Sequence, residues 1–222
     1  KRLADWYQPL KAPGHRLTLV STPAGDLTGP DETSSSLSNR VDRLLLATLR
    51  SQANAVITGA ATIAREVVPV PAHAPLVIVS RLGDISPHQL KLGSPHGDQV
   101  IVVTTEETDV DPASLLPEAT VEHIRLSSPG QLPARELTDK LAKRGFSRLL
   151  FEGGPRLARA ALDAGVIGEL CLTLTGAPRH DGHPPLPWWE EQWGEGAASS
   201  VATDDQKYLY LRYQLASDGA QD

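Results

Sequence analysis

The chain has 222 residues, and its 21 lysine and arginine residues against 27 aspartate and glutamate residues give a formal net charge of −6 at pH 7. This acidic balance argues against a general nucleic-acid-binding protein, because neutralising a phosphate backbone requires a basic surface. Hydrophobic residues at 40% and charged residues at 22% exclude a disordered or collagen-like chain and are sufficient for a large core.

The single cysteine, Cys171, can form neither an intramolecular disulfide nor a cysteine-rich zinc site. No apolar run approaches the roughly 20 residues that cross a bilayer. The start of the chain also lacks the apolar stretch of a secretory signal. We therefore expect a cytoplasmic protein without a membrane partner.

Short runs rich in Val, Ile and Leu alternate with helical patterns along the chain, which is typical of a largely parallel sheet with crossover helices. The polar stretch 24–36 is predicted to be a mobile loop. The buried strands are predicted at residues 16–20, 55–58, 76–79, 100–104, 148–151 and 169–174.

Three helices are predicted between these strands. The first covers residues 38–52, with Ser38 as the N-cap. The second starts near Pro133 and stops at Gly145, and the third covers residues 155–165. The residues that give the first helix one buried face are Val41, Leu44, Leu45, Thr48 and Leu49.

The C-terminal part is expected to add antiparallel strands to the sheet. In residues 208–215 the odd-numbered positions Leu209, Leu211, Tyr213 and Leu215 form one apolar face, which is typical of a half-buried edge strand. We expect the proline- and tryptophan-rich residues 178–200 to form a long loop and residues 1–15 to be an N-terminal extension. The prediction is one α/β domain over residues 1–222, with a mostly parallel central sheet.

The turn after the strand at 148–151 is the strongest local signal for a binding site. It contains Glu152, Gly153 and Gly154, and Pro155 is suited to the first position of the following helix. Free backbone N–H groups and the positive end of a helix dipole suit a phosphate or pyrophosphate group. The alternative is a tight turn that binds nothing.

Two further strand ends have the same character. Gly59 ends a strand and Thr62 is a candidate cap of a short helix. Ser80 and Arg81 end the next strand, and an arginine in this place suits the 2′-phosphate of NADP. The carboxyl ends of parallel strands meet at one edge of a sheet, where open α/β sheets bind nucleotides. The alternatives are an ordinary cap and a solvated arginine.

Other signals favour structural interpretations. His180 and His183 lie in a loop without a third convincing ligand, so no metal site is predicted. Trp188, Trp189 and Trp193 are interpreted as side chains that pin the loop, with a dimer contact as the alternative. The sequence has no serine-hydrolase, P-loop or zinc-deaminase motif.

Two stretches resemble the reductase domain of the bacterial riboflavin-biosynthesis deaminase/reductase, a member of the dihydrofolate-reductase-like superfamily. Residues 50–66 are similar to the family segment R-x-x-A-D-A-V-L-V-G-x-x-T-x-x-x-E. Residues 152–157 and 164–170 are similar to E-G-G-x-x-L and L-V-D-E-L. Weaker similarity extends from about Leu17 to the last strand, so the resemblance covers most of the chain.

The resemblance implies a single-domain three-layer α/β sandwich, a homodimer and a reductase of riboflavin biosynthesis. The implied reaction is hydride transfer from NADPH to C1′ of the ribosyl group of a phosphoribosylamino-pyrimidinone. Glu152 is the best ionisable candidate for a catalytic group, and the alternative is a strand-end carboxylate bonded to backbone. The residues assigned to NADPH are Gly59, Thr62, Ser80, Arg81, Gly153, Gly154 and Pro155.

One departure from the family concerns the substrate. The family reads S-x-D-G in its first loop, where the aspartate helps hold the substrate, but this sequence has Ala24 at the matching position. Asp26 can take its place only if the loop is rearranged. We predict that Ser21, Thr22 and Asp26 bind the substrate, with an ordinary loop as the alternative. Dihydrofolate reduction and a catalytically silent nucleotide-binding homologue stay open as alternative functions.

Overall fold

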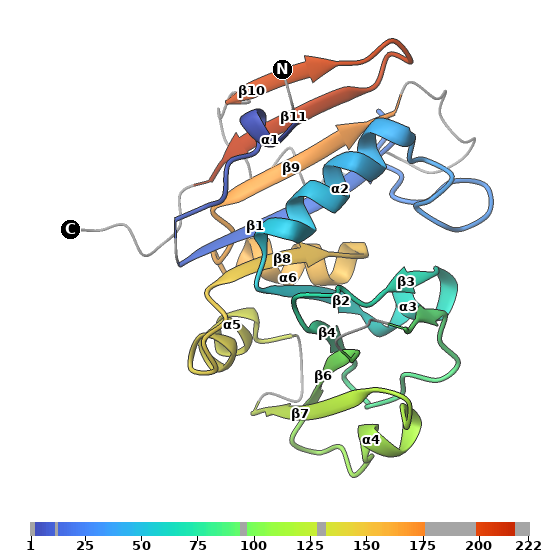
Figure 1. The fold of residues 1–222 in the computed structure, drawn as a ribbon, viewed down its shortest axis with the longest axis vertical. Coiled ribbons are helices and arrows are strands. Elements are labelled where there is room, and N and C mark those ends of the chain that lie inside the picture. Colours follow the sequence, from blue (N-terminus) through green and yellow to red (C-terminus); the bar gives the residue numbers. More distant parts are fainter. Residues whose placement is uncertain (1–2, 12, 94–96, 128–131, 176–198, 216–222) are drawn as a thin grey trace.

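A nine-stranded mixed sheet runs through the molecule (Figure 1). The computed structural model describes residues 3–11, 13–93, 97–127, 132–175 and 199–215. The strand order is β10-β11-β9-β1-β8-β2-β4-β6-β7. The strands are β1 (Gly14–Ser21), β2 (Ala55–Gly59), β4 (Leu76–Val79), β6 (Gln99–Thr105), β7 (Thr120–Leu126), β8 (Arg148–Glu152), β9 (Glu169–Leu174), β10 (Ser200–Thr203) and β11 (Leu209–Gln214). The neighbours from β9 to β7 are parallel, whereas β11 is antiparallel to β9 and β10, so the predicted mixed sheet is confirmed.

Helices cover both faces of the sheet and make three layers. The helices are α1 (Leu3–Trp6), α2 (Arg40–Gln52), α3 (Ala60–Arg65), α4 (Pro112–Leu115), α5 (Ala134–Ala142) and α6 (Pro155–Asp163). Buried residues of α2 and α3 share one hydrophobic cluster, and those of α5 and α6 share the other. Because successive strand residues point to opposite faces, Leu149 and Phe151 join the second cluster while Leu150 joins the first.

The edge strand β7 and the outermost strand β10 were not predicted from the sequence, nor was the short parallel ladder of β3 (Val68–Pro69) with β5 (Leu90–Lys91). These strands are short or half polar because one side faces solvent, so they lack the continuous apolar run that marks a buried parallel strand. The predicted strands that coincide with observed ones are the interior members of the sheet.

The helix starts differ from those predicted. The N-cap of α2 is Asn39 rather than Ser38, and the Asn39 side chain accepts a 2.8 Å hydrogen bond from the Asp42 amide. Pro133 is the N-cap of α5 rather than its first helical residue. Thr62 lies inside α3, which has Gly59 as its N-cap. The predicted start of α6 at Pro155 is confirmed.

The C-terminal strand β11 pairs antiparallel with β9, as predicted, but β10 lies outside it, so β11 is not the edge. The predicted buried face is also wrong in part. Tyr210, an even-numbered residue, is 4% exposed, whereas Leu209 is 40% exposed. The Tyr210 hydroxyl donates a 2.7 Å hydrogen bond to Asp204, so its polar tip is paired while its ring is buried.

The predicted long loop at 178–200 lies almost wholly outside the described residues, together with the histidines and tryptophans discussed above. Of that range the structure describes Ser199 and Ser200, and Ser200 already begins β10. The predicted N-terminal extension is also shorter than expected, because Gly14 and His15 belong to β1.

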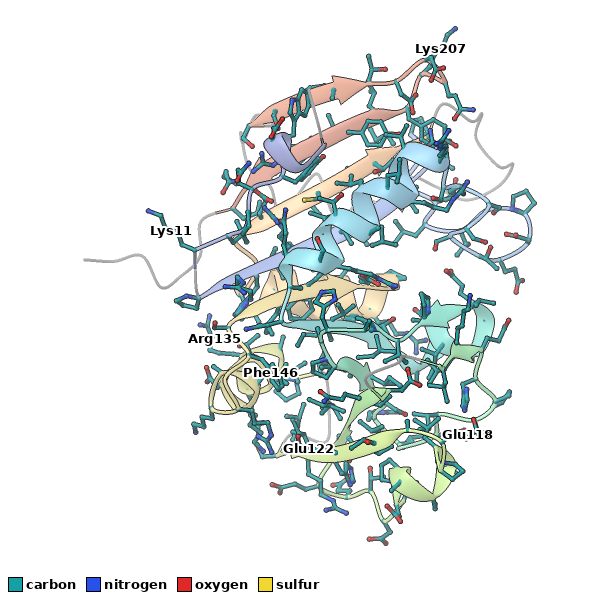
Figure 2. The ribbon with its side chains drawn as sticks, viewed as in Figure 1. Lys11, Glu118, Glu122, Arg135, Phe146 and Lys207 are labelled. Atoms are coloured by element: carbon teal, nitrogen blue, oxygen red, sulfur yellow. The ribbon has the colours of Figure 1, made fainter. Side chains whose placement is uncertain are left out.

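A buried ionic network holds the N-terminal segment against the sheet. Glu169, fully buried, accepts hydrogen bonds from Arg16 and Arg212. Burial raises the pKa of Glu169, but the two arginines outweigh it, and the net shift is downward. Both arginines also donate to backbone carbonyls of the segment, at Gln8 and Trp6. Further along this segment, the exposed Lys11 points away from the sheet (Figure 2).

Candidate functional site

The predicted site residues lie at or just after the ends of four adjacent parallel strands, β1, β8, β2 and β4. The carboxyl ends of these strands meet at one edge of the sheet, and each is followed there by one of the predicted segments. The residues at this edge are, in strand order, Ser21, Thr22 and Asp26, then Glu152, Gly153, Gly154 and Pro155, then Gly59 and Thr62, then Ser80 and Arg81. Open α/β sheets bind their ligands at such an edge.

The two glycine turns lie against each other. Gly153 has a φ of 148°, a conformation that side chains rarely adopt. A Cβ built on Gly153 would lie 3.6 Å from the Gly59 amide nitrogen and 3.7 Å from the hydroxyl oxygen of Thr58. It would also lie 3.3 Å from the Leu157 side chain. This position therefore requires glycine, and Thr58 is a neighbour that the sequence did not single out.

The other two glycines face open space. A Cβ on Gly59 or on Gly154 would meet no atom within 4 Å. Gly154 is the N-cap of α6 and provides no side-chain hydrogen bond, so the first backbone N–H groups of α6 have no side-chain cap from it. Uncapped amides beside open space fit a phosphate group of a dinucleotide.

Arg81 lines a surface pocket with a volume of about 340 Å³. Its side chain is exposed and has no ion pair or hydrogen bond to other described residues, while its carbonyl accepts hydrogen bonds from the hydroxyls of Thr105 (3.3 Å) and Thr108 (3.0 Å). The two threonines were not predicted as site residues, although Thr105 ends the buried strand β6 and Thr108 lies in the turn after it. The other lining residues are Leu82, Glu107, Asp109 and Val110.

Ser80 is placed differently from Arg81. It is 6% exposed, and its hydroxyl donates a 2.7 Å hydrogen bond to the Asp84 carbonyl. This bond closes the turn after β4 and commits the hydroxyl proton to the backbone. The arginine, not the serine, is therefore the group available for an anion.

The loop after β1 turns back on itself between Thr22 and Asp26. The Thr22 hydroxyl donates a 2.7 Å hydrogen bond to the Asp26 carboxylate and accepts one of 3.1 Å from the Asp26 amide. Gly25, with a φ of 95°, permits this turn. The turn therefore brings Asp26, which follows Ala24 by two residues, back to the end of β1. The buried Ser21 hydroxyl donates a 2.7 Å hydrogen bond to the Thr22 carbonyl.

Glu152, the predicted catalytic residue, has both carboxylate oxygens engaged by one partner. Arg50 Nε donates to Oε1 at 2.7 Å and Nη2 donates to Oε2 at 2.5 Å. The side chains are 16% (Arg50) and 11% (Glu152) exposed. A carboxylate held in this way is an acceptor and is poorly suited to donate a proton. The expected alternative of a carboxylate bonded to backbone also differs, because the partner is a side chain.

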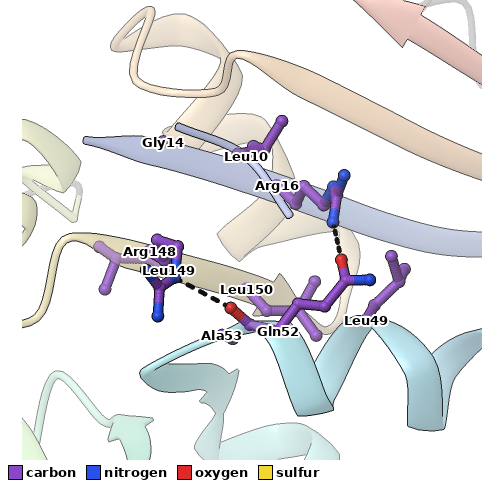
Figure 3. Close-up of a pocket in the computed structure, with 9 residues that line it drawn as sticks. All are labelled: Leu10, Gly14, Arg16, Leu49, Gln52, Ala53, Arg148, Leu149 and Leu150. Atoms are coloured by element: carbon purple, nitrogen blue, oxygen red, sulfur yellow. Dashed lines mark hydrogen bonds between the residues drawn. The ribbon is translucent and has the colours of Figure 1, made fainter. Parts of the chain in front are cut away.

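A second hollow lies at the opposite, amino edge of the strands (Figure 3). Its volume of about 10 Å³ holds roughly one water molecule. Gly14 and Arg148, at the starts of β1 and β8, line it, so it is remote from the predicted site residues.

Two negative findings apply to the described part of the chain. It contains no group of three or more histidine, cysteine, aspartate or glutamate side chains that could hold a metal ion. None of its helices is both long enough and apolar enough to span a membrane.

Comparison with known proteins gives consistent matches. Residues 18–178 match the model of the RibD C-terminal domain. The riboflavin biosynthesis protein RibD of Chlamydia muridarum is 30% identical over 159 residues, which are 64% of this chain and 42% of that protein. The chain thus spans less than half the length of this relative.

Solved structures share the fold at low sequence identity. A pyrimidine reductase-like protein from Corynebacterium diphtheriae has a TM-score of 0.73 at 20% identity, covering 98% of this chain and 96% of that one. The reductase Rib7 of Saccharomyces cerevisiae has a TM-score of 0.65 at 13% identity, covering 96% and 98%. A deaminase/5-amino-6-(5-phosphoribosylamino)uracil reductase from Thermotoga maritima has a TM-score of 0.69 at 17% identity, covering 92% and 57%.

Proposed function

This chain belongs to the family of RibD C-terminal domains, and we propose that it is an NADPH-dependent reductase that acts on a phosphoribosylamino-pyrimidinone of riboflavin biosynthesis. The observation that carries the proposal is the shared sheet edge. There, two glycine turns with open space, an arginine without an ion pair to the described residues and a carboxylate-bearing loop lie at the ends of adjacent parallel strands. The fold relatives include a pyrimidine reductase-like protein and a riboflavin biosynthesis reductase.

The cofactor assignment rests on the fit of this edge to a dinucleotide phosphate. The amides at Gly153 and Gly154 would hold the pyrophosphate, and Arg81 would receive the 2′-phosphate. A charge-assisted hydrogen bond contributes ~1.5–3 kcal/mol, so two amides supply about 3–6 kcal/mol where micromolar binding needs about 8 kcal/mol. Arg81 and the buried rings of the cofactor supply the rest, against opposing charge from Glu107 and Asp109.

The substrate assignment rests on the turn between Thr22 and Asp26. The Asp26 carboxylate has hydrogen-bonding capacity left beyond the bond from Thr22. It can accept from amino or hydroxyl groups of a pyrimidine or ribosyl substrate, the role that the family's loop aspartate has. Ser21 shapes this loop through its bond to the Thr22 carbonyl.

When bound, NADPH supplies a hydride to C1′ of the ribosyl group. The task of this chain is to align donor and acceptor and to exclude water from the space between them. We assign Glu152 to this alignment, as a support of the glycine turn through Arg50, and not to proton donation.

A direct test is acceptor-dependent oxidation of NADPH, followed by the loss of nicotinamide absorbance. We expect turnover with 5-amino-6-(5-phosphoribosylamino)uracil and none with dihydrofolate. Turnover with dihydrofolate alone would replace the proposed substrate. Binding of NADPH without hydride transfer to either compound would identify a silent homologue. The homodimer implied by the resemblance stays a prediction, which sedimentation velocity measures separately.

A further inference from the structure

Glu66 joins two loops of the site that are distant in sequence. Its Oε1 accepts a 2.8 Å hydrogen bond from the Ser34 amide, and its Oε2 accepts one of 2.8 Å from the Ser34 hydroxyl. Both oxygens of a half-buried carboxylate are thus used on a single residue of the loop after β1. Charge-assisted bonds of this bidentate kind fix orientation as well as distance.

The two ends of this connection belong to different halves of the proposed site. Glu66 is the C-cap of α3, and its amide donates a 2.8 Å hydrogen bond to the Thr62 carbonyl. The other end of α3 is Gly59, which lies against Gly153 in the cofactor turn. One short helix therefore spans from the cofactor turn to the anchor.

On the loop side, Ser34 lies between the Thr22–Asp26 turn and the start of α2. The Leu37 amide donates a 3.0 Å hydrogen bond to the Ser34 carbonyl, and Leu37 is 4% exposed. The segment that begins at the Thr22–Asp26 turn is thus fixed at Leu37 and held to α3 at Ser34. The polar loop expected to be mobile has a specific attachment point.

We propose that Glu66 is a positioning residue that couples occupancy of the cofactor turn to the placement of the substrate loop. The inference rests on the proposed function, because it needs NADPH at the turn beside Gly59 and the acceptor near Asp26. A cofactor that orders the start of α3 also orders its C-cap, Glu66. The hydrogen bonds from Ser34 to the Glu66 carboxylate then restrict the position of the loop that contains Ser34. This role requires no contact of Glu66 with either ligand.

The test compares Glu66→Ala with two other variants. Glu66→Gln keeps one acceptor oxygen for the Ser34 amide and an NH₂ group that can donate to its hydroxyl, so it is the conservative rescue. Glu118→Ala removes an exposed carboxylate between α4 and β7, outside the strand ends that form the proposed site, and is the matched control (Figure 2). Hydrogen exchange of residues 22–36 is measured with and without NADPH, alongside NADPH affinity, acceptor KM, kcat and Tm.

In the wild type and in Glu118→Ala, we expect saturating NADPH to slow exchange in this loop at least about fivefold, the lower end of usual coupling between sites. In Glu66→Ala this slowing disappears and the acceptor KM, measured at saturating NADPH, rises about tenfold. The kcat and the NADPH affinity measured without acceptor stay within about twofold. Glu66→Gln restores most of the slowing and of the acceptor KM.

Other outcomes overturn the inference in distinguishable ways. Retained slowing in Glu66→Ala contradicts coupling through Glu66, and so does a roughly tenfold fall in the NADPH affinity measured without acceptor, which would indicate direct damage to the cofactor turn. Wild-type protein that binds NADPH without slower exchange in the loop contradicts the coupling but leaves the proposed function standing. Wild-type protein that does not bind NADPH overturns both.

Discussion

The Arg50–Glu152 ion pair bears on both catalysis and stability. Burial opposes the charge of Arg50, but the hydrogen bonds and charge of Glu152 outweigh it and raise the pKa of Arg50 above its usual value. Removing one member of such a pair leaves a largely buried charge without its partner. The pair therefore fixes the end of β8 and with it the glycine turn that follows.

We predict that Glu152→Gln lowers the free energy of unfolding by about 3 kcal/mol, the lower end for a buried pair. The control is Glu122→Gln, in the exposed pair with Arg144, which is expected to cost less than about 1 kcal/mol. Urea denaturation measures both. Equal costs would show that the Arg50–Glu152 pair is not structural. A loss of kcat beyond about 100-fold without loss of stability would restore Glu152 as a catalytic acid.

His15 is a residue whose environment makes stability depend on pH. Its ring lies 6.5 Å from that of Phe151, and its buried Nδ1 has no hydrogen-bond partner among the described residues. Burial lowers its pKa below 6.5, against a smaller opposing effect of the backbone at Gly14. Between the lowered pKa and 6.5, the unfolded chain binds more protons than the folded one.

It follows that the free energy of unfolding decreases as the pH falls through and below 6.5. Urea denaturation between about pH 7.5 and pH 5.5 measures this slope. We predict a shallower slope for His15→Gln than for the wild type. Identical slopes for wild type and His15→Gln would refute the assignment.

At the scale of elements, the turn from β8 into α6 separates structural from functional glycines. Gly153 has the positive φ and the close neighbours, whereas Gly154 has an extended conformation and open space. Alanine in place of Gly153 would be strained, whereas alanine in place of Gly154 would fill the space proposed for the cofactor phosphate.

We predict that Gly154→Ala changes Tm by less than about 4 °C, the effect of roughly 1 kcal/mol in a domain of this size. Its NADPH affinity falls at least about tenfold, equivalent to about 1.4 kcal/mol. Gly168→Ala, at the amino edge with its nearest contact at 3.9 Å, is the control and keeps its affinity. Unchanged NADPH affinity in Gly154→Ala would mean that the open space is not the cofactor site.

The interior elements could be predicted from the sequence because burial on both faces favours a run of apolar residues, which is unbroken in β4. The edge strands β7 and β10 could not, since a polar side facing solvent removes that run. Helix starts were misplaced by one residue where two polar residues compete for the cap, as with Ser38 and Asn39.

For the whole molecule, the sheet order decides what the separate turns can do together. Parallel strands predict that their turns share an edge, but no sequence pattern gives the order β1-β8-β2-β4 that makes these turns neighbours. Contacts across long separations were equally inaccessible. Arg50 and Glu152 are 102 positions apart, and Ser34 and Glu66 are 32 apart. The motif identified Glu152, but only the fold identifies its partner.

The overall charge of −6 adds a requirement for an anionic cofactor. Long-range electrostatics repels NADPH, so its binding depends on local positive groups at the sheet edge. Arg81 is exposed and has no ion pair with other described residues. Its contribution should therefore depend on the 2′-phosphate and be absent for NADH.

The most direct measurement is a fluorescence titration of the wild type and of Arg81→Ala with NADPH and with NADH. The account predicts that the wild type binds NADPH at least about tenfold more tightly than NADH, as expected for one charge-assisted contact of ~1.5–3 kcal/mol. In Arg81→Ala this preference falls to within about threefold, with NADH affinity unchanged. Absence of saturable binding of either nucleotide by the wild type would contradict the central claim and leave the glycine turns as architecture alone.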